Sequence, residues 1–191
     1  MNLNRLRAKL ALASIAALLI GGCGGGDSTT GSDGGSEAPR LYPALKGPTR
    51  EFLVPEGDNV VQIYGREATK AEREQVSRVI EAWMRARAEK RDAVECTYLD
   101  PANVESTLTS ASYMAQRKVK SCADALAVLA KNGYRGPRAN NMTGPIDSLR
   151  IAEGRGYAQY HGNDGRDWIV PVRNVEGEWK VSTLDPIDRM K

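Results

Sequence analysis

The hydrophobic pattern of the chain changes near Gly144 from the spacing of helices to the alternation of strands. Beyond this point an acidic residue precedes glycine three times at nearly even spacing, at Glu153-Gly154, Asp164-Gly165 and Glu176-Gly177. Such pairs between strand-like runs predict tight hairpin turns, and Asp-Gly is the strongest signal among them. Loops this short can join only antiparallel strands. The last part of the chain is therefore predicted to be an antiparallel meander, with strands over Ile146–Ala152, Gly156–His161, Asp167–Val175 and Trp179–Leu184.

Three helices are predicted upstream of the meander. The clearest spans Thr69–Arg91, where Thr69 and Glu72 have the spacing of a capping box. One face of this helix is apolar, with residues at the intervals of a buried helical stripe. The members of this stripe are Val76, Val79, Ile80, Trp83 and Met84.

The other two helices are indicated by their first residues. Asp100 is a favourable N-cap and Pro101 a favourable first residue, which predicts a helix running to about Met114. Ser121 precedes a third helix over Cys122–Lys131, which Gly133 is predicted to end. Helices followed by a meander indicate an α+β fold, with N-terminal helices packed on one face of a curved antiparallel sheet.

The segment before the first helix contains Pro39, Pro43, Pro48 and Pro55, and we expect no helix there. Asn59–Tyr64 is apolar and β-branched. It is predicted to be either a short strand or an extended arm laid against the domain.

The first 22 residues have the pattern of an export signal. A basic start (Arg5, Arg7 and Lys9) precedes an apolar stretch, Leu10–Ile20, of about 11 residues, which suits a signal peptide and is too short to span a membrane. Ile20-Gly21-Gly22-Cys23 then resembles the lipobox of bacterial lipoproteins. The resemblance implies lipid transfer to the Cys23 sulfur, cleavage before it, and a domain anchored to the membrane outside the cytoplasm.

These features divide the chain into four parts. Residues 1–22 are the predicted signal, and residues 23–45 are a lipidated cysteine with a Gly- and Ser-rich tether, whose composition is typical of flexible linkers. Residues 46–66 are an extended arm, and residues 67–188 are the folded domain. The alternative to a lipoprotein is an ordinary secretory signal followed by an incidental cysteine.

Charge argues against nucleic acid as a partner. The chain carries 27 basic and 24 acidic residues, and three of the basic ones lie in the signal. The processed chain is therefore electrically balanced, whereas nucleic-acid binding needs a basic excess. Arg117, Lys118 and Lys120 could form a local basic patch, but they are interpreted as a solvated face.

Two cysteines remain after Cys23, namely Cys96 and Cys122. An even pair in an exported protein predicts a disulfide, which would close a loop of about 27 residues and stabilise the fold by ~3.5 kcal/mol. The alternatives are a redox pair, which usually has the form Cys-x-x-Cys, and a zinc site, which needs about four ligands. With one histidine in the chain, no metal centre is predicted.

Several of these segments together resemble the small NTF2-like lipoproteins of actinobacterial type. They are Tyr64–Thr69 leading into the first helix, Ala82-Trp83 within it, the two cysteines, and Gly177–Val181 in the last strand. This superfamily includes SnoaL-type cyclases and ketosteroid isomerases. The resemblance implies a cone in which the curved sheet wraps around the long helix and leaves a pocket at its open end.

The catalytic candidates are weak. His161 is the only histidine, and alternation along its strand places it on one face with Tyr157 and Gln159. If that face lined the cone, His161 could be a general base with Tyr157 as a hydrogen-bond donor. A histidine beside a turn is more often solvated, so no catalytic residue is assigned. No Gly-rich phosphate loop lies between a strand and a helix, so no cofactor is predicted.

The leading hypothesis is a non-catalytic binding module of the cell envelope. It would use the cone pocket or the sheet face to bind a small ligand or an envelope protein near the membrane. The first alternative is an NTF2-like enzyme of isomerase or cyclase type that acts on a hydrophobic small molecule. The second is a dimerisation module that forms a homodimer.

Overall fold

The computed structural model describes residues 45–54, 57–133, 142 and 144–188. The chain divides into two units, Met1–Ala38 and Pro39–Lys191, and every described residue belongs to the second. The predicted signal, Cys23 and the tether up to residue 44 lie outside the described residues. Within the described part, no helix combines the length and the hydrophobicity that a membrane span requires.

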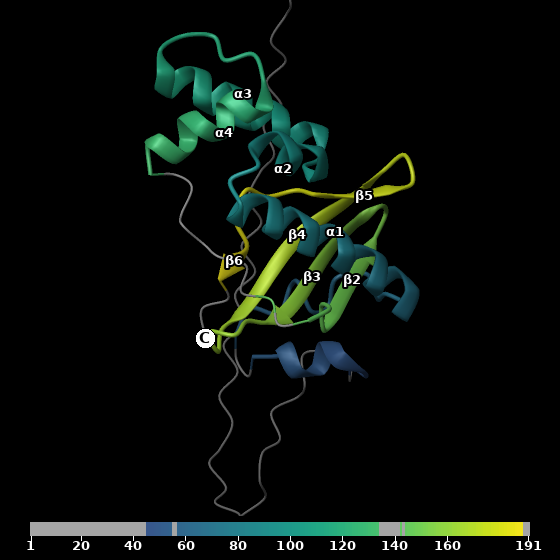
Figure 1. Cartoon of the computed structure of the whole chain (residues 1–191). Helices are drawn as coiled ribbons and strands as arrows, with labels where there is room; N and C mark the ends of the chain where they lie inside the picture. The colour runs from purple at the N-terminus through teal and green to yellow at the C-terminus, as the bar shows by residue number, and fades with distance from the viewer. Residues whose placement is uncertain (1–44, 55–56, 134–141, 143, 189–191) are drawn as a thin grey trace, which may run out of the picture. The chain divides into compact units, whose positions relative to one another are not determined.

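The fold class is confirmed as α+β. Four α-helices precede or flank an open, six-stranded antiparallel sheet (Figure 1). The helical elements are η1 (Pro48–Phe52, a 3₁₀ turn), α1 (Lys70–Ala88), α2 (Asp92–Tyr98), α3 (Pro101–Ala115) and α4 (Cys122–Lys131). The strands are β1 (Arg66–Glu67), β2 (Ser148–Ala152), β3 (Arg155–His161), β4 (Asp167–Val175), β5 (Glu178–Val181) and β6 (Ile187–Asp188).

The predicted meander is confirmed. The strand order is β1-β2-β3-β4-β5, and β6 pairs with β4 beside β5. At Glu153-Gly154 and Glu176-Gly177 both residues have positive φ, 49° and 72° in the first pair and 53° and 92° in the second. Two consecutive positive φ values are typical of the hairpin turns whose twist matches that of the strands. The two weaker turn signals are therefore tight hairpins.

The helix predicted over Thr69–Arg91 is confirmed as α1. The Thr69 amide donates to the Glu72 carboxylate at 2.7 Å, and the Glu72 amide donates to the Thr69 hydroxyl at 3.3 Å, which completes the capping box. The apolar stripe lies on the sheet: Val76, Ile80 and Trp83 have no exposed surface.

The two later helices also begin where their caps predict. The Asp100 carboxylate accepts the Asn103 amide at 2.9 Å, and the Ser121 hydroxyl accepts the Asp124 amide at 3.1 Å. The sequence reading missed α2. This helix is only seven residues long, its N-cap Arg91 supplies no capping side chain, and the turn before it needs a positive φ of 57° at Lys90.

The prediction for the segment before α1 needs correction. Asn59–Tyr64 is not a strand: it turns, and the Ile63 amide donates to the Asn59 carbonyl at 3.1 Å. The prolines do not exclude all helix either, because Pro48 is the first residue of η1, where its missing amide hydrogen costs nothing. Strands β1 and β6 were not predicted, since two residues are too few for alternation.

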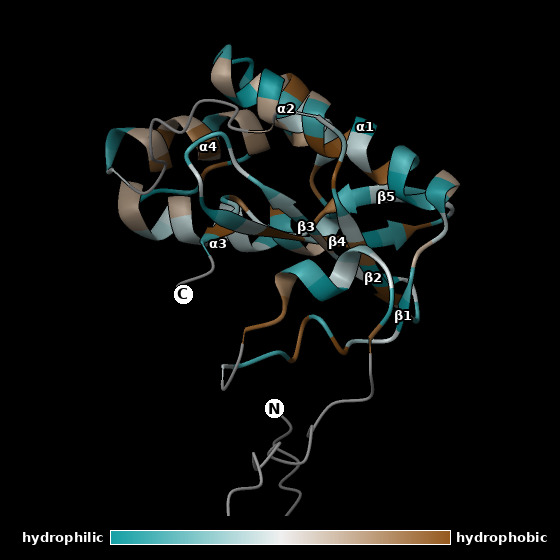
Figure 2. Ribbon diagram, turned by 90° about the horizontal axis from the view of Figure 1, so that it is seen from below, coloured by the Kyte–Doolittle hydropathy of each residue, from teal (hydrophilic) through white to brown (hydrophobic). Residues whose placement is uncertain are grey.

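The two faces of the sheet are covered by different parts of the chain. Helix α1 covers one face, and the segment from η1 to Tyr64 covers the other (Figures 1 and 2). On the α1 face, the core residues Trp83, Tyr160 and Trp168 fill the space between helix and sheet, each at most 3% exposed.

Polar side chains hold the N-terminal segment to the second face. The Glu67 carboxylate accepts hydrogen bonds from the hydroxyls of Thr49 and Ser148, and the Gln62 amide donates to the Gln159 side-chain oxygen at 3.1 Å. Burial lowers the pKa of the Arg150 guanidinium, which lies 3.9 Å from Glu67. Because buried polar groups need partners, this network specifies how the segment lies on the sheet.

Candidate functional site

His161 and Tyr157 share a face of β3, as alternation predicts, but that face points away from α1. Their strand neighbours Ala158 and Tyr160 belong to the core under α1 instead. A catalytic role for His161 required its side chain to line the space between the sheet and the long helix. That condition is therefore not met. The side chains of this second face contact the N-terminal segment.

His161 contacts four neighbours at the edge of the second face, one of which is Glu51, whose carboxylate lies 3.9 Å from the His161 Nε2. Its Nδ1 lies 2.7 Å from the Asp167 carboxylate, and its ring stacks on Phe52 with centroids 4.6 Å apart. Its backbone amide donates to the Asp147 carboxylate at 2.9 Å. These contacts join η1, β3 and β4, which is a structural role.

A hollow of about 230 Å³ lies beside this histidine, lined by Gly144, Pro145, Asp147, Tyr160 and His161. It is smaller than the pockets of roughly 300–1,000 Å³ that hold small ligands. Tyr157, the other candidate, packs edge to face on Tyr64, with centroids 5.0 Å apart. Neither side chain is placed to serve as a catalytic group for a ligand on the α1 face. Within the described ranges, no three His, Cys, Asp or Glu side chains are grouped to hold a metal ion.

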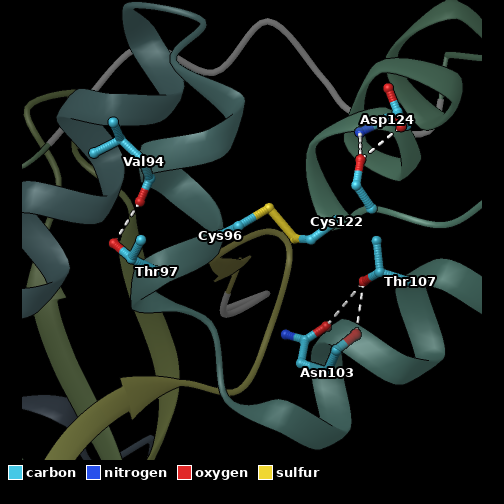
Figure 3. The surroundings of a disulfide bond; sticks show 8 residues. Val94, Cys96, Thr97, Asn103, Thr107, Cys122 and Asp124 are labelled. Atoms are coloured by element: carbon cyan, nitrogen blue, oxygen red, sulfur yellow. Dashed lines mark hydrogen bonds between the residues drawn. A yellow bond between two sulfur atoms is a disulfide. The ribbon is translucent and has the colours of Figure 1, made fainter.

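The predicted disulfide is present between Cys96 and Cys122, with their Cα atoms 6.0 Å apart. It links the end of α2 to the first residue of α4 (Figure 3). Asn103 and Thr107 of α3 lie beside it, joined by a hydrogen bond of 2.7 Å from the Thr107 hydroxyl to the Asn103 carbonyl. The bond thus ties the helix pair α3–α4 to the rest of the domain.

The helix pair carries an open surface groove with a volume of about 590 Å³ and a mainly apolar lining. We call it the hairpin groove. It is lined by Leu108, Thr109, Ser112, Lys118, Val119 and Lys120. Figure 1 shows α3 and α4 extending beyond the sheet.

The groove forms because the chain reverses direction after α3. Gln116 adopts a left-handed conformation with φ 50°, which ends the helix. The chain then folds back along α3, and the Val119 amide donates to the Ser112 hydroxyl at 3.0 Å. Val119 packs with Ala111 and Leu129 in a small core of its own, and is 5% exposed. Two cationic residues, Lys118 and Lys120, flank this apolar floor in the sequence.

The cations of this segment are available to a ligand. Within the described part of the chain, no carboxylate forms an ion pair with Arg117, Lys118 or Lys120. All three are exposed, and Tyr113 on the neighbouring turn of α3 is 85% exposed. Residues 101–121 contain these three cations and one carboxylate, Glu105, for a net charge of +2.

A third hollow, of about 310 Å³, lies between α1 and β5 and is lined in part by Tyr98, Trp179 and Lys180. Its cation is already engaged: the Lys180 ammonium donates to the Thr97 carbonyl at 3.1 Å and lies 2.9 Å from Glu178. The hairpin groove therefore offers the better site for an anion.

Sequence reasoning interpreted Arg117, Lys118 and Lys120 as a solvated face and did not predict the groove. One signal was present, namely three cations within four residues directly after a helix with no basic residue. The sequence signal did not predict the apolar floor of the groove, because that floor exists only where Val119 folds back onto α3. Comparison with protein-family models, with curated proteins and with solved structures finds no significant match to this chain.

Proposed function

We propose that this chain is an exported lipoprotein whose domain is a non-catalytic binding module, and that its ligand is an amphipathic anion held in the hairpin groove. The single observation that carries the binding proposal is an open apolar groove flanked by cations that have no acidic partner within the described residues. Ligand sites combine an apolar lining with a few polar groups that orient the ligand. An alkyl chain would lie against Leu108 and Val119, and its charged head beside Lys118 and Lys120.

The anchor is proposed from the sequence of the leader. A basic start, a short apolar stretch and two small residues before Cys23 are the features that favour acylation. Two or more acyl chains are needed for stable anchoring, because one chain holds a protein only reversibly.

An NTF2-like fold is part of the proposal. It is supported by the element order, with a long capped helix followed by an antiparallel meander, and by the packing of Trp83 of that helix in the core with residues of the sheet. Because aromatic side chains fill the face under α1, we place the ligand outside the sheet, on the helix pair. The filled face is also why a non-catalytic module is favoured over an isomerase or cyclase.

The binding proposal is tested with hexyl phosphate as the probe and hexanol as its uncharged counterpart, followed by amide chemical shifts. We expect hexyl phosphate to shift the amides of Ser112, Lys118, Val119 and Lys120 in a saturable way, and hexanol to shift them far less. The double variant Lys118→Gln/Lys120→Gln should weaken binding about tenfold or more, since charge-assisted contacts are the strong ones. Equal shifts from both probes, or shifts confined to other elements, would refute the site.

The anchor is tested separately by metabolic labelling with palmitate in a bacterial host that acylates lipoproteins. The native chain should incorporate the label, and Cys23→Ser should not. Cys96→Ser/Cys122→Ser is the matched control, because it removes two other thiols and leaves the leader intact. Label retained in the Cys23→Ser chain would contradict the anchor without affecting the groove.

A further inference from the structure

We infer that the hairpin groove and its rim form a docking surface for an anionic lipid bilayer, so that the domain touches the membrane at a second point besides its acyl anchor. The inference deepens the proposed function and rests on it, because it names the source of the amphipathic anion. We call this surface the basic apolar face. It comprises the groove residues Leu108, Lys118, Val119 and Lys120 and the exposed residues that adjoin groove residues in the chain, Tyr113 after Ser112 and Arg117 before Lys118.

The net positive charge of this face suits a membrane surface that is covered with anionic headgroups. The processed chain is balanced at 24 basic and 24 acidic residues, yet residues 101–121 carry a net +2, so the rest carries a net −2. Of the acids nearest in the sequence, Asp124 accepts a hydrogen bond from the Ser121 hydroxyl at 2.6 Å, and Glu105 precedes Leu108 and Thr109 of the groove by about one helical turn. Basic residues near an anionic bilayer each contribute about 1 kcal/mol.

The exposed aromatic distinguishes a bilayer from an acidic peptide as the occupant. Tyr113 is 85% exposed, the highest value among the large hydrophobic side chains that the structure describes as exposed. Tyrosine is enriched at the depth of lipid headgroups, where its ring meets the acyl region and its hydroxyl meets water. The groove itself is short and open, which suits the head and first methylenes of a lipid better than an extended chain.

The predicted anchor supplies the proximity that a weak surface needs. Cys23, where the acyl anchor is predicted, precedes the first described residue, Leu45, by 22 positions. A tethered site meets its target at an effective concentration near the millimolar range. Even a modest affinity of the basic apolar face would therefore hold the domain on the bilayer.

The test uses the processed chain with Cys23→Ser, which lacks acyl groups and contains every described residue. Sedimentation with vesicles of phosphatidylglycerol and phosphatidylcholine measures its partition coefficient, and pure phosphatidylcholine vesicles are the neutral reference. We expect binding to the anionic vesicles alone, lost at high salt. Lys118→Gln/Lys120→Gln should lower the partition coefficient about 30-fold, and Tyr113→Ser should lower it several-fold.

The matched control is Arg78→Gln/Arg85→Gln, which removes two exposed cations from the outer face of α1. It should change the partition coefficient less than threefold. Equal loss in both double variants, or equal binding to neutral vesicles, would overturn the inference. So would groove-dependent binding to a poly-glutamate peptide with none to vesicles, which would assign the surface to an acidic protein. If the protein binds hexyl phosphate but not vesicles, the inference of a bilayer-docking surface is refuted and the proposed function still stands.

Discussion

Among the described glycines, Gly65 combines a positive φ with the closest approach of other atoms to the position that a Cβ would occupy, so its lack of a side chain is required by the fold. It has a φ of 48°, and a Cβ at this position would overlap the Ile151 carbonyl of β2. Gly133, which ends α4, also has a positive φ, of 75°, but a Cβ there would meet nothing within 4 Å. Substituting Gly133 therefore tests only the free-energy cost of the backbone conformation, whereas substituting Gly65 adds the cost of a steric clash.

We predict that Gly65→Ala destabilises the protein by at least ~2 kcal/mol more than Gly133→Ala. The latter should cost only the ~1–2 kcal/mol of placing a side chain in the left-handed region. Chemical denaturation of the two variants measures the difference. Equal losses would show that β2 moves to accommodate the new methyl group.

At the scale of elements, helix α1 depends on its first turn. The Glu72 carboxylate accepts hydrogen bonds from Arg66 at 2.7 and 3.0 Å and from the Thr69 amide at 2.7 Å. These partners lower the pKa of Glu72 to about 2, with the Arg66 hydrogen bond as the largest cause. The ionised form is thus the one that the folded state prefers.

This lowered pKa predicts a pH dependence of stability. The contribution of Glu72 is fully present above pH ~4.5, its ordinary pKa, and is lost as pH falls toward 2. The native chain and Glu72→Gln should therefore differ in urea midpoint at pH 6, and the difference should shrink steadily between pH 4.5 and pH 2.5. The exposed Glu74→Gln is the control, because it removes a carboxylate from the same helix without touching the capping box. A constant difference for Glu72→Gln would disprove the assignment.

The disulfide acts on the same scale, since it holds α2 to α4. Replacing both partners with serine in Cys96→Ser/Cys122→Ser should lower the free energy of unfolding by ~3–4 kcal/mol, from the closed loop with a sequence separation of 26. Denaturation of the native chain with and without reductant should reproduce this loss. Reductant should leave the double variant unchanged, and a loss in that variant would mean that another thiol matters.

At the scale of the whole molecule, the N-terminal segment is a structural layer rather than an appendage. Phe52 is 1% exposed and stacks on His161, while Thr49 and Gln62 form hydrogen bonds with side chains of the sheet. The segment from η1 to Tyr64 thus buries the face of the sheet opposite α1, through both polar and apolar contacts.

We predict that Phe52→Ala destabilises the protein by ~3–4 kcal/mol, the usual range for removing a buried aromatic ring. It should also raise amide hydrogen exchange across residues 48–64 more than across α3. Val60→Ala is the control, because Val60 is 63% exposed and its truncation should cost under ~0.5 kcal/mol. If amide hydrogen exchange is accelerated equally across the whole domain, residues 48–64 do not unfold independently of the rest.

The starts of the long helices and the hairpin turns could be predicted from the sequence, because short-range signals determine them. The caps at Thr69, Asp100 and Ser121 and the two Glu-Gly turns each operate within four residues, and the structure has them. The same is true of the cysteine pair, where an even count of cysteines beyond Cys23 predicts the bond that joins Cys96 to Cys122. The third acidic-Gly pair, Asp164-Gly165, is not a two-residue turn: it lies in a longer connection over residues 162–166, where Gly165 has a positive φ and Asp164 does not. The missed elements, α2, β1 and β6, are short and lack such signals, and they form because neighbouring elements hold them in place.

The tertiary structure alone decided which face of the meander meets α1 and where a ligand could bind. Alternation assigns Tyr157 and His161 to one face but cannot say what covers it, since either face of the sheet could receive the helix. The pattern of Lys118 and Lys120 likewise shows charge, whereas the apolar floor between them depends on Val119 reaching α3 across a turn. Long-range packing selects among locally equivalent arrangements, and that selection is where the candidate site arises.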